Sequence, residues 1–235
     1  MFATTRWSLI LAARDRQAPA ADAALAELCA AYWYPLYVFI RHSGRDATAA
    51  EDLTQEFFAR LLEKSWLGQA ERAKGRFRSF LLTACRNFLA NEYDREVALK
   101  RGGGRVALAF DFHEADNRYA REPAHSLTPE RLFERRYALA LLDQVMTALR
   151  AEYVETGKEP LFDALKGTLE RPTDAPAYAE IATQLGMTVG AIKVAAHRLR
   201  QRYRSRLRAA IGQTLDNPAA VDDEIRHLFA ALATP

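Results

Sequence analysis

Apolar residues recur every three or four positions along most of this chain, which is the spacing of amphipathic helices. No stretch shows the apolar and polar alternation of a half-buried strand. The first hundred residues carry three helical stretches. Their apolar positions are Leu25, Leu28, Tyr32, Leu36 and Phe39, then Leu53, Phe57, Phe58, Leu61 and Leu62, and finally Phe77, Phe80, Leu81, Ala84, Phe88 and Leu89. The pattern predicts a compact domain over residues 1–97, with a kink at Pro35 and a capping box formed by Thr48 and Glu51.

Helical spacing weakens over residues 98–128, which include the basic, glycine-rich stretch KRGGGR. This composition is typical of a flexible linker, and about thirty residues is long enough for a functional or a disordered segment. Helical spacing returns where Thr128 is suited to be the N-cap and Pro129 the first helical residue. The apolar positions that follow are Leu142, Val145, Met146, Leu149 and Tyr153, then Leu161, Phe162, Leu165 and Leu169.

We therefore predict an all-α fold with two helical domains, residues 1–97 and 129–212, joined by the linker. Residues 213–235 are expected to form a C-terminal helical extension. Asn217 is its predicted N-cap and Pro218 its predicted first residue. Its apolar face consists of Val221, Ile225, Leu228, Phe229 and Leu232.

Residues 178–200, YAEIATQLGMTVGAIKVAAHRLR, have the spacing of a helix-turn-helix. Ala182 is the small residue where two helices cross, Gly186 is placed to take the left-handed turn conformation, and Ile192 is the apolar anchor. Thr188 is the predicted N-cap of the second helix. The rest of the core is expected to include Ile181, Leu185 and Met187. An ordinary helix pair with a glycine turn is the alternative.

Charge is distributed unevenly, although the formal net charge is only +3. Residues 191–210 hold seven Lys or Arg and no acid, so the remainder of the chain is slightly acidic. A helix-turn-helix would present the first half of this basic helix to a DNA major groove. The residues predicted to meet DNA are Val189, Gly190, Ala191, Lys193, Val194, His197, Arg198 and Arg200. Lys193, His197 and Arg198 are the expected base readers, and the later arginines are expected to contact phosphates; a solvated basic face is the alternative.

Motifs of enzymes are missing from the sequence: it has no glycine-rich phosphate loop, nucleophile elbow or His-rich metal motif. Cys29 and Cys85 fall in apolar stretches and are expected to be buried, reduced thiols. No apolar run reaches the ~20 residues needed to span a bilayer, and the N-terminus lacks a signal-peptide cleavage pattern. We expect a cytoplasmic protein that is not an enzyme and uses no metal or cofactor.

Three segments resemble extracytoplasmic-function (ECF) sigma factors, the promoter-recognition subunits of bacterial RNA polymerase. Residues 49–62, AAEDLTQEFFARLL, are similar to the family's second conserved region, usually DAEDLVQETFLRLW. Residues 75–95 are similar to the segment that meets the downstream promoter element, and residues 178–202 resemble the fourth region. The opening TTRWSLILAA and the C-terminal extension resemble the subgroup associated with Ser/Thr protein kinases.

The resemblance implies that the first domain grips a coiled coil of the polymerase's largest subunit and opens the minus-ten element. The second would lie on the flap of the next-largest subunit and read the minus-thirty-five element. The implied partners are core RNA polymerase, promoter DNA and a Ser/Thr protein kinase, with no membrane; an anti-sigma partner stays open. On this reading the protein associates with the nucleoid when it is bound to polymerase.

The resemblance also assigns candidate residues in the first domain. The polymerase-binding edge would be formed by neighbours spaced four apart, Glu51, Asp52, Gln55 and Glu56. The minus-ten contacts would come from Phe77, Phe80, Arg86, Asn87 and Asn91, beside the cations Arg76 and Arg78, since unstacked bases bind aromatic rings next to cations. Alternatively, both phenylalanines are core residues, which helix periodicity favours for Phe80. Asn87 aligns with a family position that lines the pocket for a flipped base.

Two departures from the family pattern concern the second region, where Ala49 replaces an acid and Thr54 replaces the usual valine. A phosphate on Thr54 would restore negative charge, which makes it a candidate phosphosite. Alternatively, Thr54 is a β-branched core residue whose hydroxyl bonds to the Ala50 carbonyl. The main rival function is a freestanding helix-turn-helix regulator whose N-terminal domain senses a signal or dimerises.

Overall fold

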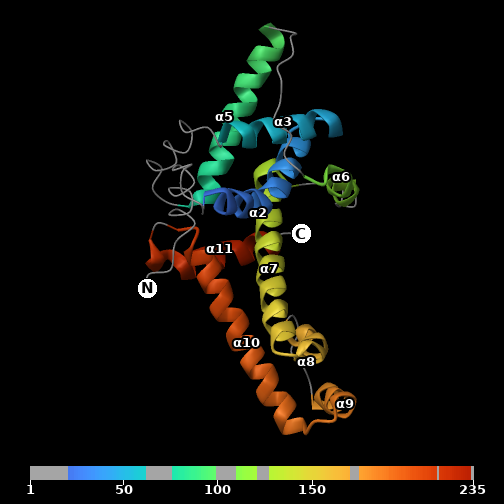
Figure 1. The fold of residues 1–235 in the computed structure, drawn as a ribbon. Coiled ribbons are helices and arrows are strands. Elements are labelled where there is room, and N and C mark those ends of the chain that lie inside the picture. The colour runs from blue at the N-terminus through green and yellow to red at the C-terminus, as the bar shows by residue number, and fades with distance from the viewer. Residues whose placement is uncertain are drawn as a thin grey trace. The chain divides into compact units, whose positions relative to one another are not determined.

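The structure is a computed structural model that describes residues 21–61, 76–98, 110–120, 127–169, 175–215 and 217–233. Its elements there are α2 (Ala21–His42), α3 (Ala47–Leu61), α5 (Phe77–Ala98), α6 (Phe112–Ala120), α7 (Pro129–Glu155), α8 (Glu159–Leu165), η1 (Lys166–Leu169), α9 (Ala175–Leu185), α10 (Val189–Gly212), η2 (Pro218–Ala220) and α11 (Val221–Ala233) (Figure 1). Within these ranges the only β pairing is an isolated bridge between Arg76 and Leu215. The predicted all-α class is confirmed.

The chain divides into two compact units, which differ from the predicted domains. The first unit comprises residues 1–140 together with 211–235, and the second comprises residues 141–210. Both boundaries fall inside helices, α7 and α10. The C-terminal helix α11 therefore belongs with the N-terminal helices, and the first part of α7 does too.

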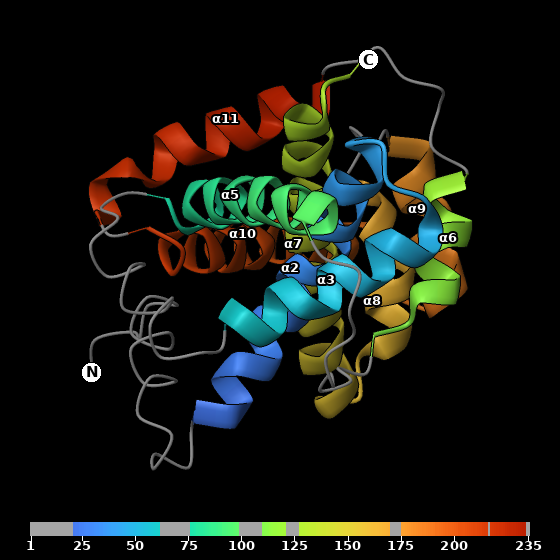
Figure 2. The ribbon, with the colours of Figure 1, turned by 90° about the horizontal axis from the view of Figure 1, so that it is seen from above.

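Helices α2, α3 and α5 belong to the first unit (Figure 2). Aromatic rings of these helices make up much of its core. Tyr32 of α2 is fully buried, with its ring edge-on to Phe77 of α5 at 5.4 Å between centroids. The same ring stacks on Tyr137 of α7 at 5.1 Å. Phe57 of α3 packs against Phe88 of α5 at 5.7 Å. Most of these contacts follow the apolar spacing of the sequence, because Tyr32, Phe57, Phe77 and Phe88 lie at predicted apolar positions of their helices. Tyr137 was not among the predicted positions.

Helix starts follow short polar side chains, but one predicted cap is wrong. The Thr128 hydroxyl accepts a hydrogen bond from the Arg131 amide at 3.4 Å, as predicted for the start of α7. At α3 the cap is Asp46, whose carboxylate accepts from the Ala49 amide at 2.8 Å. The helix thus begins one residue before Thr48, and the predicted Thr48–Glu51 capping box does not form. An aspartate is an equally good N-cap and its charge also suits the helix dipole.

The C-terminal helix also starts differently from the prediction. Asn217 accepts a hydrogen bond from the Ala219 amide at 3.0 Å, as expected for a cap. However, Pro218 begins the short 3-10 helix η2, and α11 follows only from Val221.

Part of the predicted linker is an ordered element of the first unit. Phe110 stacks on Trp33 of α2 at 5.2 Å and lies edge-on to Phe58 of α3 at 5.5 Å. Phe112, the first residue of α6, is buried and packs against Tyr37 at 5.6 Å. Residues 110–120 are therefore not a free linker. Their nine-residue helix is too short to produce a clear periodic pattern.

Polar contacts also hold α6 against α2. The Tyr37 hydroxyl donates to Asp116 at 3.0 Å, and the same carboxylate pairs with Arg41 at 3.0 Å. Burial, followed by the hydrogen bond to Asp116, raises the pKa of Tyr37 well above its usual value. His42 lies 3.3 Å from the Tyr119 hydroxyl and 3.0 Å from the Leu127 carbonyl oxygen. Asp116, Tyr119 and Leu127 are thus tied to the C-terminal end of α2.

A buried group of charges, here called the Arg78 clamp, joins α5, α7 and α11. The carboxylate of Glu224, only 1% exposed, accepts from Arg78 at 2.7 Å and from Arg76 at 2.7 Å. Arg78, 2% exposed, also donates to Glu134 of α7 at 2.5 Å. His227 of α11 lies 3.1 Å from the other oxygen of Glu134. The clamp attaches the C-terminal helix to the start of α5.

The electrostatics of the clamp favour its charged form. Burial by itself lowers the pKa of Arg78, but Glu224 and then Glu134 outweigh burial and raise that pKa above its usual value. Burial raises the pKa of Glu134, but Arg78 and His227 outweigh it and the pKa falls below its usual value. Backbone contacts reinforce the clamp, since the Phe77 amide donates to the Thr214 carbonyl at 3.2 Å.

Replacing Glu224 with alanine would leave the Arg78 guanidinium buried without its main partner. We expect the free energy of unfolding to fall by about 3–5 kcal/mol, measured by urea unfolding followed by circular dichroism. The matched control is Asp223→Ala on the same helix, because the ion pair of Asp223 with Arg226 is largely exposed. The control should cost less than about 1 kcal/mol, and equal losses in both variants would contradict the role of the clamp.

Candidate nucleic-acid interface

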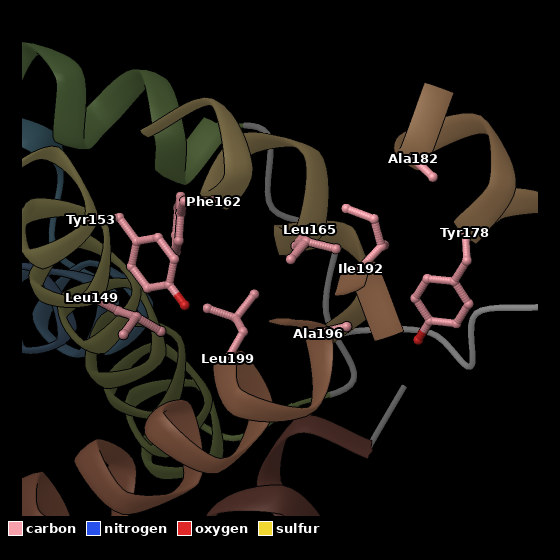
Figure 3. Packing of buried hydrophobic residues seen from close by; sticks show 9 residues of the cluster. All are labelled: Leu149, Tyr153, Phe162, Leu165, Tyr178, Ala182, Ile192, Ala196 and Leu199. Carbon is pink, nitrogen blue, oxygen red and sulfur yellow. The ribbon is translucent and has the colours of Figure 1, made fainter. Parts of the chain in front are cut away.

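An apolar cluster in the second unit supports helices α9 and α10 from beneath (Figure 3). Its buried members are Leu149 and Tyr153 of α7, Phe162 and Leu165 of α8, Tyr178 and Ala182 of α9, and Ile192, Ala196 and Leu199 of α10. The rings of Tyr153 and Phe162 lie 5.5 Å apart between centroids. Ala182 and Ile192, predicted as the crossing residue and the anchor, are 4% and 0% exposed. Burial of this face turns the opposite face of α10 to solvent.

The turn between α9 and α10 has the predicted backbone. Gly186 has φ +64°, in the left-handed region that favours glycine. The Met187 amide donates to the Ala182 carbonyl at 2.9 Å, which closes the end of α9. Thr188 accepts from the Ala191 amide at 3.2 Å and so caps α10, as predicted. Met187 is 38% exposed, which corrects its predicted place in the core: it follows the left-handed residue and so leaves the line of α9.

Two glycines beside this turn give a matched test of its backbone. A β-carbon on Gly186 or on Gly190 would meet no atom within 4 Å, so neither alanine would clash with a neighbouring residue. Gly186→Ala should lower the free energy of unfolding by about 1–2 kcal/mol, because alanine would have to remain left-handed. Gly190→Ala, inside α10, should raise it by about 0.4–1 kcal/mol. Thermal unfolding measures both, and a neutral Gly186→Ala would show that the turn does not need the left-handed conformation.

Most of the residues predicted to meet duplex DNA lie together on the outer face of α10. Val189 and Val194 are 38% and 50% exposed. The exposed set also includes Gly190, Lys193, His197 and Arg198, whereas Ala191 is half-buried. The arrangement can offer methyl groups, an ammonium, an imidazole and a guanidinium to base edges, which is the chemistry that a major groove requires.

Some arginines of this helix have structural partners within the second unit. The Arg200 guanidinium donates to the Thr168 carbonyl at 3.2 Å and to the Tyr178 hydroxyl at 2.9 Å. Arg200 therefore braces α9 and η1 against α10 instead of standing free for DNA as predicted. Arg206 pairs with Glu152 of α7. Arg198 and Arg204 are exposed and remain suitable for contacts with a polyanion.

The residues predicted to contact the minus-ten element differ in their exposure to solvent. Phe77 is fully buried against Tyr32, so its ring is not available to a base. Phe80 is half-buried, 6.0 Å from the Phe77 ring. Arg86, Asn87 and Asn91 are exposed on α5. The neighbouring cations Arg76 and Arg78 are held by Glu224 in the Arg78 clamp.

One exposed aromatic residue of α5, Tyr93, was not among the residues predicted from the sequence to contact DNA. Tyr93 is 60% exposed. It follows Arg86 by seven residues, two helical turns, and this spacing was the signal that would have placed it on the same face.

The four residues of the predicted polymerase-binding edge lie on one side of α3. Glu51, Asp52, Gln55 and Glu56 are all half-buried, opposite the buried Phe57. Glu56 pairs with Arg60 at 2.5 Å, and Arg60 also pairs with Glu92 of α5 at 2.8 Å. The edge is acidic and accessible in part, and its Glu56 carboxylate is engaged within the unit.

Thr54 occupies the position described by the core alternative. It is 0% exposed, and its hydroxyl donates to the Ala50 carbonyl at 2.6 Å. A kinase cannot reach this hydroxyl while α3 is packed as it is here. The structure therefore favours the core alternative for Thr54 over the phosphosite.

In the part of the chain that the structure describes, no three His, Cys, Asp or Glu residues lie close enough together to bind a metal ion. No helix there has the length and apolar character of a membrane span. Cys29 and Cys85 are buried, and burial raises the pKa of Cys29 to about 11 and that of Cys85 further. Comparison of the chain with models of protein families, with curated proteins and with solved structures found no match.

Proposed function

We propose that this protein is a sigma factor of the ECF type, which directs RNA polymerase to promoters and helps to open them. The observation that carries the proposal is the α9–α10 pair. Its left-handed Gly186, its capped second helix and its buried underside are features of a DNA-binding helix-turn-helix. The outer face of α10 then bears Lys193, His197 and Arg198 where base readers are needed.

Features of the first unit support the proposed binding to polymerase and the proposed opening of promoters. Its helix α3 resembles the polymerase-binding region of ECF sigma factors and carries an acidic edge of four half-buried polar residues. Its helix α5 presents Arg86, Asn87 and Asn91 to solvent. Amides and a guanidinium on one surface suit unpaired bases and their phosphates. The proposed partners are thus core RNA polymerase and promoter DNA.

The first test concerns dependence on polymerase. We expect the purified chain to stimulate run-off transcription from genomic fragments only when core RNA polymerase is present, and to copurify with that polymerase at low salt. The reason is that DNA contacts divided between two units leave neither unit sufficient alone. Tight, specific binding of promoter duplex by the chain without polymerase would instead favour a freestanding regulator.

The second test separates base readers from phosphate contacts on α10. Lys193→Ala and Arg198→Ala should each lose about 1–3 kcal/mol of discrimination between promoters. Arg204→Ala, the matched control farther along the helix, should weaken all promoters alike and reduce the salt dependence by about one phosphate contact. All three side chains are exposed, so the fold should not change. The measurement is the affinity of each variant's holoenzyme for different promoters at several salt concentrations. Identical behaviour of the three variants would contradict the division into base readers and phosphate contacts.

A further inference from the structure

A pocket lies between the start of α7 and the second half of α11, two segments of the first unit. Its volume is about 210 Å³. An apolar protein cavity of roughly 150 Å³ is large enough to hold benzene, whereas drug-sized ligands occupy roughly 300–1,000 Å³. The pocket therefore fits a ligand of about six to ten non-hydrogen atoms.

The lining combines apolar and polar side chains. Its members are Leu127, Ala230 and Ala231, which are apolar, and Arg131, Glu134 and His227, which are polar. Leu127 is buried, whereas Arg131 is exposed at the rim. An apolar wall with a few polar groups is the usual composition of a site for a small molecule.

The charge of this lining favours an anionic ligand. Both oxygens of the Glu134 carboxylate are engaged, one by Arg78 at 2.5 Å and the other by His227 at 3.1 Å. The Arg131 guanidinium is exposed, and among the described residues no hydrogen bond or ion pair engages it. Arg131 is thus the charged group of the lining that is available to a ligand.

Charged groups of α7 and α2 near the pocket do not offset this cation. Glu130, which precedes Arg131 in the chain, pairs with Arg86 of α5 at 2.6 Å. Arg135, one helical turn after Arg131, adds positive charge. His42 of α2 reaches the backbone just before α7 and carries no negative charge. The α7 side of the pocket is therefore positive.

The carboxylates of α11 also have other partners. They lie in its first turn, at Asp222, Asp223 and Glu224, whereas the pocket is lined by His227 and residues after it. Glu224 is bound in the Arg78 clamp, Asp223 pairs with Arg226, and Asp222 is engaged as well. An anion at Arg131 meets no unpaired carboxylate of the described part of α11.

We infer that this pocket binds a small organic monocarboxylate with a short apolar body. The carboxylate lies on the Arg131 guanidinium, which can donate two parallel hydrogen bonds to it. The apolar body lies against Leu127, Ala230 and Ala231. A monocarboxylate suits the lining better than a phosphate monoester, because one available cation matches one negative charge and a phosphate carries nearly two. The site goes beyond the proposed function, which uses none of these residues.

Binding stabilises the attachment of α11 to α7. The pocket exists only while the two helices are packed together, since each supplies part of its lining. Glu134 and His227 belong both to the lining and to the Arg78 clamp. A ligand that binds the packed state and not the unfolded chain shifts the equilibrium toward the packed state. The ligand therefore acts on the same helix contact as the clamp.

The test is titration of the full-length chain with sodium benzoate, followed by saturation-transfer NMR of the benzoate signals. For a ligand of this size we expect saturable binding with a dissociation constant on the order of 1 mM. Benzamide has nearly the same shape without the charge. It should bind about 10- to 100-fold more weakly, the loss typical of one charge-assisted hydrogen bond.

Two variants with matched controls locate the site. Arg131→Gln removes the cation at an exposed position and should weaken benzoate to the level of benzamide. Its control is Arg226→Gln, an exposed arginine of α11 outside the lining, which should bind as the original chain does. Ala231→Leu fills the pocket and should abolish binding of both compounds. Its control is Ala233→Leu, at an exposed position of the same helix.

Thermal unfolding gives a second readout. Benzoate at about ten times its dissociation constant should raise the Tm of the original chain by about 3–6 °C. Arg131→Gln should show no such rise, and this comparison removes any general effect of the salt. Saturable binding without a rise in Tm would place benzoate on a surface that survives unfolding and would overturn the site.

Three further results would also overturn the site. The first is the absence of saturable benzoate binding up to about 20 mM, well above the expected constant. The second is equal affinity for benzoate and benzamide, which would remove the role of the carboxylate. The third is an equal loss in Arg131→Gln and Arg226→Gln, which would reduce the effect to general attraction between benzoate and surface cations. Circular dichroism of Arg131→Gln should match that of the original chain, because the side chain is exposed.

Discussion

Burial of the Arg78 guanidinium is the constraint on which the first unit depends. A buried cation is tolerated only when carboxylates surround it, and here they come from Glu134 of α7 and Glu224 of α11, 56 and 146 residues along the chain. The clamp therefore determines that the C-terminal helix packs with the N-terminal helices. It also sets the rotation of α5 about its axis, since Phe77, Arg78 and Leu81 must point inward. In a helix of 3.6 residues per turn, that choice turns Arg86 and Asn87 outward.

A similar argument explains the surface of α10 in the second unit. Ile192, Ala196 and Leu199 are buried among residues of α7, α8 and α9, so Lys193, Val194, His197 and Arg198 are exposed. The basic side chains do not all share one role, however. Arg200 bonds to Thr168 and Tyr178 and stabilises the packing, while Arg198, two residues before it, is left to the solvent. A basic run in a sequence thus overstates the number of side chains available to a nucleic acid.

The segment around α6 shows how aromatic residues can order a stretch that has little periodicity. Phe110 and Phe112 supply four ring contacts to α2 and α3: both pack against Trp33, Phe110 also against Phe58, and Phe112 also against Tyr37. Such rings bury much apolar area per residue. A segment with two of them can dock without forming a long amphipathic helix. This is why composition and spacing predicted a linker where the structure has a packed helix.

The sequence by itself determined the features that depend on neighbouring residues: the helical class, the caps at Thr128 and Thr188, the left-handed Gly186, and the inner faces that bury Tyr32, Phe57 and Ile192. The hydroxyl of Thr54 bonding to Ala50 was also one of two alternatives that local helix geometry allowed. The tertiary structure decided what depends on residues far apart in the chain. It placed α11 on α5 through Glu224 and Arg78, buried Phe77, and left Tyr93 exposed. Local periodicity tells which residues of a helix share a face, but only the partner helices, brought together by burial and charge, decide which face remains in contact with water.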